Sequence, residues 1–213
     1  AITYPYQEEA DPEWVGDLVK VSTVVGAGPG MGRQSYAENV LKKLLNCIPK
    51  EKTLLLDADA LNMISCSEEL EQLVRDHGGN TILTPHMGEA SRLMNMPVAE
   101  IMADPLNVVL DMAIKYQAVV CLKDAQTLVA DPKGRVFFSS NGNNGMSTAG
   151  SGDVLSGILA AVCASNEARL LLAAAGGAWI NGAAGELAQQ KNGAVSMLAG
   201  DTANSIKDVI VSL

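Results

Sequence analysis

The stretch Asn141–Ala161, NGNNGMSTAGSGDVLSGILAA, is the one around which the rest of the chain is interpreted. Its first half is a loop of Gly, Asn, Ser and Thr, and its second half is a helix of small and aliphatic residues. The change falls at Gly150–Asp153, where glycines allow a positive φ and a close approach of ligand to backbone. Free N–H groups in the first helical turn, with a helix dipole worth about half a unit charge, predict an anion site.

Asp153 lies in the first turn of this predicted helix, beside the expected anion. A carboxylate is electrostatically costly there unless the chemistry needs it. A base at this place can take the proton of a hydroxyl that attacks a phosphate. The alternative is structural, because Ser and Asp are preferred helix caps. A simple cap needs neither the long Asn- and Gly-rich loop nor the hydroxyls of Ser147 and Thr148, so the pattern favours a binding loop.

The composition excludes several classes of protein. The chain has 213 residues and a net charge of −9, which predicts one α/β domain over residues 1–213 and argues against nucleic acid as a partner. No apolar run reaches the length of a membrane span, and the first residues lack the pattern of a signal peptide. The scattered Cys47, Cys66, Cys121 and Cys163 predict buried thiols in a reducing cytoplasm. We therefore expect a cytoplasmic protein without a membrane partner.

Short apolar or β-branched stretches alternate with helical ones, which is typical of a parallel sheet flanked by helices. Residues 1–17 show no clear period and are interpreted as an irregular lead-in. Parallel strands are predicted at 20–25, 53–56, 81–83 and 118–122, and a hairpin at 127–130 and 135–139. Helices are predicted at 34–46, 67–77, 97–100, 105–116, 168–190 and 197–212.

Each of the four parallel strands ends in a polar or glycine-rich segment. These segments are GAGPGMG, DADALN, TPHMGE and KDAQT. In an open parallel sheet, ligands bind beyond the carboxyl ends of the strands. The sequence therefore places its chemistry at the edge of the sheet where that architecture binds ligands.

Two of these segments have competing interpretations. GAGPGMG (26–32) lacks the G-x-G-x-x-G spacing of dinucleotide-binding turns, so it indicates either a tight strand-to-helix turn or close approach of Gly28, Gly30 and Gly32 to a ligand. In DADALN, paired carboxylates could hold Mg²⁺ through water. The alternative is that Asp59 caps the next helix, and Asp57 is then the better candidate for a site.

His86 and Lys123 are the other candidates. A lone His is usually structural, but His86 follows a strand and lies in a polar loop, where it can hydrogen-bond a substrate hydroxyl or amide. Lys123 directly follows an apolar strand, so its charge is expected to face an anion; the alternative is a surface lysine.

Taken together, GAGPGMG, DADALN, TPHMGEASRLM, LKDAQTLVADPKGRVF and NGNNGMSTAGSGDVLSGILAA resemble the ADP-dependent NAD(P)H-hydrate dehydratases of the ribokinase-like superfamily. The resemblance runs in matching order from about Val21 to the C-terminus. It implies an α/β fold, a ribokinase-like three-layer α/β/α sandwich with a mostly parallel sheet flanked by helices. The family's first strand-helix segment is expected to be missing or shortened here.

The resemblance also implies an activity and a set of contacts. The activity is removal of water from the S-epimer of hydrated NADH or NADPH with ADP (or ATP) as phosphoryl donor and Mg²⁺, releasing AMP and phosphate. Asp153 is implied as the catalytic residue, and the hydrate contacts are Gly30, Gly32, His86 and Asp153. The nucleotide contacts implied are Lys123, Asp124, Ala125, Gln126, Thr127, Ser151 and Gly152. No residue is assigned as a metal ligand, and a homo-oligomer is expected.

The chain departs from the family pattern at Met87, Asp124 and in Ala149–Asp153, where the family has Pro, Gly and Gly-Gly-Thr-Gly-Asp. Ser151 keeps a hydroxyl and Ala149 keeps a small side chain, so the anion site is expected to persist. Two alternatives stay open. One is a small-molecule kinase of the same superfamily that acts on a vitamin or sugar alcohol, and the other is a nucleotide-binding protein without catalysis.

Overall fold

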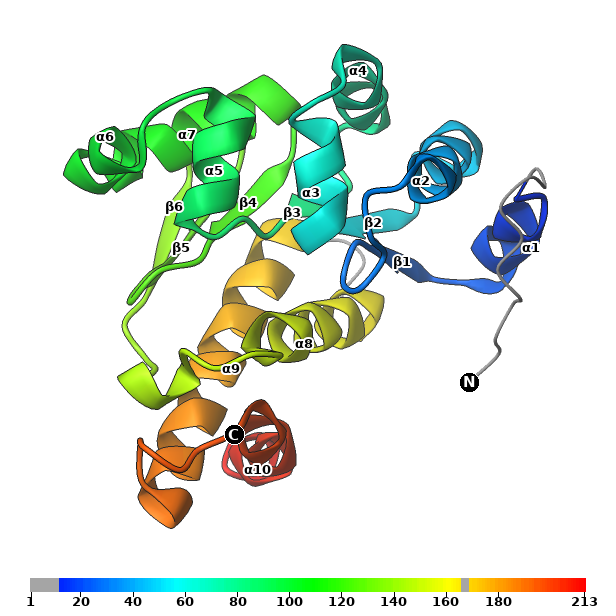
Figure 1. Ribbon diagram of the computed structural model, residues 1–213. Helices are drawn as coiled ribbons and strands as arrows, with labels where there is room; N and C mark the ends of the chain where they lie inside the picture. The colour runs from blue at the N-terminus through cyan, green and yellow to red at the C-terminus, as the bar shows by residue number, and fades with distance from the viewer. Residues whose placement is uncertain (1–11, 166–168) are drawn as a thin grey trace.

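The computed structural model describes residues 12–165 and 169–213, and these form a six-stranded sheet with helices on both faces (Figure 1). The strand order follows the chain from β1 to β6. The first four strands are parallel, and β4, β5 and β6 form an antiparallel ribbon. The strands are β1 Val24–Ala27, β2 Thr53–Leu56, β3 Thr81–Leu83, β4 Val119–Leu122, β5 Thr127–Ala130 and β6 Val136–Ser139.

The helices fall into two layers because of the strand order. Each crossover between neighbouring parallel strands is right-handed, so a sheet built in sequence places all its crossover helices on one face. The opposite face is left for the helices after β6 (Figure 1). The first layer holds α1 Trp14–Val21, α2 Ser35–Cys47, α3 Ala58–Ile64, α4 Glu68–His77, α5 Met87–Met94, α6 Val98–Ala103 and α7 Pro105–Tyr116. The second holds α8 Ser151–Ser165, α9 Leu170–Asn192 and α10 Ala199–Val211, preceded by the short 3₁₀ turn η1 Asn144–Met146.

The central strands are buried on both faces, as expected for parallel strands between helical layers. In β2, Leu54 and Leu56 join the core under the first helical layer, and Leu55 joins the core under α8 and α9. Because alternate residues of a strand point to opposite faces, an unbroken run of leucines fills both cores at once. The predicted sandwich architecture agrees with this arrangement.

Helices α3 and α5 were not among the predicted helices, and a further error lies before β1. Residues 20–25 were expected to form a strand, but Lys20 and Val21 end helix α1 and the strand begins at Val24. The cause is tertiary: Val15 and Val19 are buried, and the Lys52 ammonium donates to the carbonyls of Val19 and Ser22 at the end of the helix. The expected irregular lead-in is therefore helical from Trp14, while residues 1–11 lie outside the described part of the chain.

The cysteine prediction holds in part. Cys121 and Cys163 are buried between the sheet and α8, and burial raises the pKa of the Cys121 thiol to about 12 and that of Cys163 to about 11. Cys47 is half-buried, and Cys66 is exposed in the turn between α3 and α4, so the expectation of burial is wrong there. All four thiols are free.

Candidate active site

The ends of the four parallel strands lie at one edge of the sheet and are joined by backbone hydrogen bonds. The amide of Asp57 donates to the Ala27 carbonyl at 3.1 Å, and the amide of Thr84 donates to the Leu56 carbonyl at 3.1 Å. The amide of Lys123 continues the series by donating to the Pro85 carbonyl at 2.8 Å. This ladder extends the sheet by about one residue beyond the strands and fixes the side chains that follow them.

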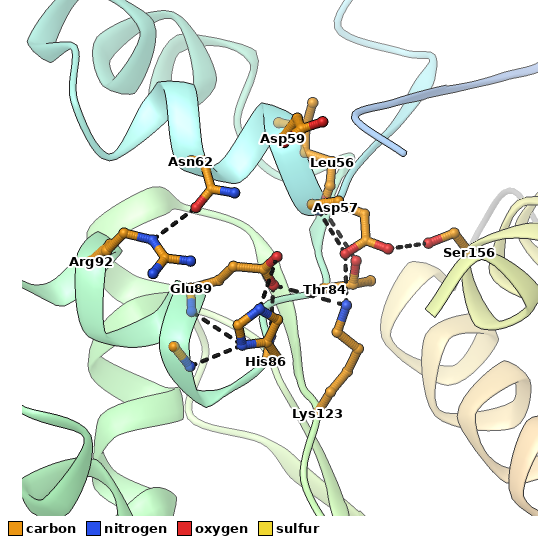
Figure 2. A network of polar contacts seen from close by, with 12 residues as sticks. Leu56, Asp57, Asp59, Asn62, Thr84, His86, Glu89, Arg92, Lys123 and Ser156 are labelled. Atoms are coloured by element: carbon orange, nitrogen blue, oxygen red, sulfur yellow. Dashed lines mark hydrogen bonds and ion pairs between the residues drawn. The ribbon is translucent and has the colours of Figure 1, made fainter. Parts of the chain in front are cut away.

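Asp57 is the most buried charged group at this edge, with 1% of the residue exposed. Its Oδ1 accepts from the Ala58 amide at 2.8 Å and from Lys123 Nζ at 2.7 Å, and its Oδ2 accepts from the Ser156 hydroxyl at 2.7 Å (Figure 2). Asp57, rather than Asp59, caps helix α3. The predicted cap at Asp59 is thus wrong, and the residue favoured for the site also does the capping.

Lys123 lies between two carboxylates. Its Nζ is 2.7 Å from Asp57 Oδ1 and 3.9 Å from Glu89 Oε2. A Cβ atom built on Gly152, in the first turn of α8, would be 3.5 Å from the same Nζ and 3.8 Å from Asp57 Oδ2. The ammonium therefore faces the start of α8, and a residue larger than Ala at position 152 would fill the space beside it.

His86 caps helix α5 through its ring. The amides of Gly88 and Glu89 donate to His86 Nδ1 at 2.9 and 3.4 Å, so the neutral ring carries its proton on Nε2. That Nε2 lies 3.3 Å from Glu89 Oε1, while Glu89 Oε2 accepts from the His86 amide at 2.8 Å. The His86 side chain is 54% exposed and Glu89 is buried. The buried carboxylate thus holds the imidazole with one edge open to a ligand.

The anion site was predicted in the first turn of α8. Gly150 precedes it with a φ of 88°, and the amides of Ser151 and Val154 donate to the carbonyls of Thr148 and Gly150. Among the described residues, no group accepts from the amides of Gly152 and Asp153. The Asp153 carboxylate is exposed. This turn therefore offers free amide donors beside a free carboxylate.

The Asn-rich loop before α8 is held against α9. Asn143 Nδ2 donates to the Gly185 carbonyl at 2.9 Å, and the Gly142 amide donates to Glu186 at 3.2 Å. Gly182 and Gly185 of α9 leave room for the loop, since a Cβ on Gly182 would lie 2.7 Å from the Asn141 carbonyl oxygen. The loop is thereby fixed by helix packing and not by its own sequence alone.

The glycines of GAGPGMG have different tasks. A Cβ on Gly28 would lie 1.7 Å from the Asp57 carbonyl oxygen, so this glycine is needed for the close packing of its backbone against the backbone of Asp57 and not for a ligand. Gly30 faces open space, and the Gly32 amide donates to Asp59 Oδ2 at 2.9 Å. Gly30 and Gly32 therefore remain the candidates for contact with a ligand.

The remaining predicted nucleotide contacts lie in the turn between β4 and β5. Asp124, Ala125 and Gln126 are exposed, and Thr127 begins β5 half-buried. They follow Lys123 directly and form one exposed rim beside it.

Sequence reasoning missed two residues of the site. Glu89 stands three residues after His86, and a Glu at that spacing from a helix cap is a capping-box signal, although His is an unusual cap. Ser156 lies in the middle of α8 among small and aliphatic residues, and no local pattern distinguishes it from its neighbours. Only its contact with Asp57, across the sheet edge, reveals it.

The carboxylates of the described residues do not form a metal-binding cluster of three or more candidate ligands. Both oxygens of Asp57 are already engaged, so it is not free to bind a metal directly. Mg²⁺ commonly binds one or two carboxylates together with substrate phosphates. The carboxylates at the strand ends therefore fit a Mg²⁺ ion that enters bound to a nucleotide better than a Mg²⁺ ion held by the protein alone.

The described residues also form a concave surface whose lining includes none of the strand-end residues. It is an apolar groove of about 630 Å³ between α8, α9 and α10. Its lining includes Ile158, Ile180 and Ile206.

Among the helices that the structure describes, none combines the length and the apolar character that a membrane-spanning segment needs.

Solved structures with the same architecture define the class of fold. A ribokinase-like superfamily protein from Enterococcus faecalis matches with a TM-score of 0.82 at 23% identity, over 93% of this chain and 66% of that one. An ADP/ATP-dependent NAD(P)H-hydrate dehydratase from Bacillus subtilis, co-crystallised with ATP and Mg²⁺, matches with a TM-score of 0.76 at 23% identity, over 93% and 69% of the two chains. The fold is ribokinase-like, as the sequence predicted.

Sequence comparison is more specific. The family model described as NAD(P)H-hydrate dehydratase matches residues 1–208. The chain is 41% identical over 181 residues to the ADP-dependent (S)-NAD(P)H-hydrate dehydratase of Neisseria meningitidis, covering 84% of this chain and 60% of the relative. It is 40% identical over 190 residues to the bifunctional NAD(P)H-hydrate repair enzyme of Moorella thermoacetica, covering 89% and 35%. The chain belongs to the NAD(P)H-hydrate dehydratase family and spans between about a third and 60% of the length of these two relatives.

Proposed function

We propose that this protein dehydrates the S-epimer of hydrated NADH or NADPH to the reduced cofactor, using ADP and releasing AMP and phosphate. The observation that carries the proposal is an exposed carboxylate, Asp153, beside free amides in the first turn of α8, where the Cβ position of Gly152 lies 3.5 Å from Lys123 Nζ. The relative from Neisseria meningitidis is an ADP-dependent (S)-NAD(P)H-hydrate dehydratase, which supports the same activity here.

Asp153 is the proposed general base. The hydroxyl of the hydrate attacks the β-phosphorus of ADP, Asp153 takes its proton, and the bond from phosphorus to the bridging oxygen breaks so that AMP leaves. General-base catalysis of this kind contributes about 10²–10⁴-fold. The new phosphate ester then departs from the ring as phosphate, pushed by the ring nitrogen, and loss of a ring proton restores the double bond.

The nucleotide is proposed to lie along the rim of Lys123, Asp124, Ala125, Gln126 and Thr127, with its phosphates at Ser151 and Gly152. Free amides of a helix N-terminus and a fixed ammonium stabilise the charge that develops during phosphoryl transfer. When bound with the nucleotide, Mg²⁺ would neutralise phosphate charge. ATP is the alternative donor, since the Bacillus subtilis dehydratase is ADP/ATP-dependent.

The hydrate is proposed to contact Gly30, Gly32 and His86. Nδ1 of His86 already accepts from backbone amides, and its Nε2 proton faces Glu89 at the 54% exposed side chain, so Nε2–H is the group that would donate to a substrate amide or hydroxyl, in place of or shared with the Glu89 contact. Gly30 has open space around it, which admits a ring against the backbone.

The test is to incubate the protein with S-epimer hydrated NADH, Mg²⁺ and either ADP or ATP. Recovery of the absorbance of reduced nicotinamide, with AMP as the nucleotide product from ADP, is the expected result. A stable phosphorylated alcohol would identify a kinase of the same superfamily. Nucleotide that binds but stays intact in the presence of hydrate would identify a binding protein without catalysis.

We further propose that the protein acts in the cytoplasm as a homo-oligomer. Free thiols at all four cysteines suit a reducing compartment. The apolar groove between α8, α9 and α10 is a surface that a second copy would cover. Light scattering on the purified protein tests self-association, and a mass equal to one chain would reject it.

A further inference from the structure

The buried Asp57 carboxylate joins three elements that carry the proposed site. It caps α3 through the Ala58 amide, pairs with Lys123 after β4 at 2.7 Å, and accepts from Ser156 of α8 at 2.7 Å (Figure 2). These elements are far apart in sequence, since Asp57 and Ser156 are 99 residues apart. A single carboxylate therefore fixes the distance between the Lys123 ammonium and helix α8.

The contact with Ser156 also sets which side of α8 faces the strand ends. Gly152 and Ser156 are four residues apart, so they lie on the same face of the helix, one turn from each other. The hydrogen bond from Ser156 to Asp57 thus turns Gly152 toward Lys123 Nζ, and the Cβ position of Gly152 is 3.5 Å from that atom. The free amides of the first turn are held beside the ammonium in consequence.

The burial of Asp57 fits a positioning task. A buried carboxylate is costly unless it is paired and hydrogen-bonded, and here one oxygen has two donors and the other has one. Ala58, which follows it, has a φ of 48°, a conformation that non-glycine residues rarely adopt. The local backbone is thus held in an uncommon conformation at the point where the carboxylate meets Lys123.

We propose that Asp57 is a positioning residue that aligns the Lys123 ammonium with the first turn of α8 for the nucleotide phosphates, and that it does so without binding metal. The proposal rests on the proposed function in that ADP is taken as the nucleotide. It differs from the interpretation of Asp57 as a Mg²⁺ ligand, because the carboxylate oxygens act on the protein itself.

The test measures the affinity for ADP by calorimetry in EDTA, with no divalent cation present. Asp57→Asn keeps the shape of the side chain and removes its charge, which leaves Glu89, at 3.9 Å, as the carboxylate nearest to Lys123. We expect affinity for ADP to fall about tenfold or more, the scale of a lost hydrogen bond to a charged group. Asp131→Asn is the matched control. Asp131 is also buried and paired, with Arg135, but it lies at the β5–β6 turn, so its variant should keep wild-type affinity.

A second pair of variants separates positioning from folding. Ser156→Ala leaves the Asp57–Lys123 pair and removes only the tie to α8, and we expect affinity for ADP to fall about 3–10-fold. Ser165→Ala, which removes an exposed hydroxyl from the same helix, should leave affinity unchanged. If Asp57→Asn does not fold, as judged by thermal unfolding, the Ser156 pair decides the question.

A double-mutant cycle tests whether the effect passes through Lys123. In a Lys123→Gln background, Asp57→Asn should weaken ADP binding much less than it does alone. Three results would overturn the proposal: wild-type affinity in the folded Asp57→Asn and Ser156→Ala variants, a defect that appears only with Mg²⁺, or wild-type protein that does not bind ADP in EDTA. Because these measurements need no turnover of hydrate, a protein that binds ADP and lacks dehydratase activity would reject the proposed function alone.

Discussion

Asp153 and Asp57 are acidic residues at neighbouring helix N-termini with opposite surroundings. Asp153 is exposed, and no described side chain pairs with it, whereas Asp57 is buried and fully hydrogen-bonded. A carboxylate that must accept a proton needs free oxygens within reach of substrate. The two residues are therefore suited to different tasks, Asp153 to proton transfer and Asp57 to the arrangement of the site.

The first prediction concerns Asp153. Asp153→Asn should lower kcat for dehydration about 10²–10⁴-fold, because an amide cannot take the hydroxyl proton. Thermal unfolding should change little, since the side chain is exposed. Asp17→Asn, an exposed acid in the first turn of α1, is the matched control and should keep wild-type kcat. Turnover of the Asp153→Asn enzyme near the wild-type rate would reject the base role.

The second prediction concerns His77 and pH. Burial lowers the pKa of His77, whose ring contacts the Thr81 hydroxyl at 2.8 Å and the Pro49 carbonyl at 3.2 Å. Below the unfolded pKa of about 6.5, the unfolded chain binds the proton more readily than the folded one. The contribution of His77 to stability is thus complete above this pH and falls as the pH drops toward 5. Urea unfolding should give a smaller loss of stability between pH 7 and 5 in His77→Gln than in wild type, and an identical loss would contradict this.

At the scale of elements, α9 is a helix whose glycines serve packing. Gly182 and Gly185 admit the Asn-rich loop, and Gly177 admits Leu159 of α8 at a Cβ distance of 2.8 Å. Gly176, on the same helix, has no heavy atom within 4 Å of its Cβ position. Glycine lowers helix stability by about 1 kcal/mol relative to alanine. A glycine inside α9 is therefore explained by packing only where another part of the chain lies close to its Cβ position.

The third prediction compares two glycines of α9. Gly176→Ala should raise the free energy of unfolding by about 0.5–1 kcal/mol through helix propensity. Gly182→Ala should lower it by about 1–3 kcal/mol, because the new methyl group meets the backbone of Asn141 at 2.7 Å. Urea unfolding of both variants measures the difference. The idea that α9 sets the loop fails if the two substitutions have the same sign.

At the scale of the whole molecule, the strand order decides where the chemistry lies. Four parallel strands in sequence carry their carboxyl ends to one edge, and the face they leave open receives α8 with its N-terminus at that edge (Figure 1). The proposed nucleotide site is compatible with a net charge of −9, because nearby amides and Lys123 would act on the phosphates at close range while distant charges are screened.

The fourth prediction concerns ligand binding to the folded protein. At about 100 times its dissociation constant, ADP should add about 2.7 kcal/mol to stability, which corresponds to a rise in Tm of about 5–10 °C for a chain of this size. Adenosine at the same concentration should raise Tm much less, because the free amides and Lys123 act on phosphate. Thermal unfolding measures both shifts, and an equal rise with adenosine would contradict a phosphate site at α8.

Much of the fold was predictable because its signals are local. The buried strands at Thr53–Leu56 and Thr81–Leu83 are short apolar runs, and Pro105 marks the start of α7. The strand expected at 20–25 was wrong because valines near a helix end do not distinguish helix from strand. There the decision came from Lys52, which holds the end of α1 from 30 or more residues away.

Local sequence signals predicted the fold class, the edge of the sheet at which the candidate site is sought, and the loop-to-helix turn with Asp153, because hydrophobic runs, glycines and caps act over a few residues. Only the tertiary structure decided which side chains contact one another at the candidate site. Lys123 was expected to face an anion, and the fold places it beside Asp57 and Glu89. The spacing of Glu89 from His86 is a local signal, but its approach to Lys123 and the contact of Ser156 with Asp57 arise only where separate strands and helices meet. Such contacts depend on the positions of whole elements, and no stretch of neighbouring residues encodes them.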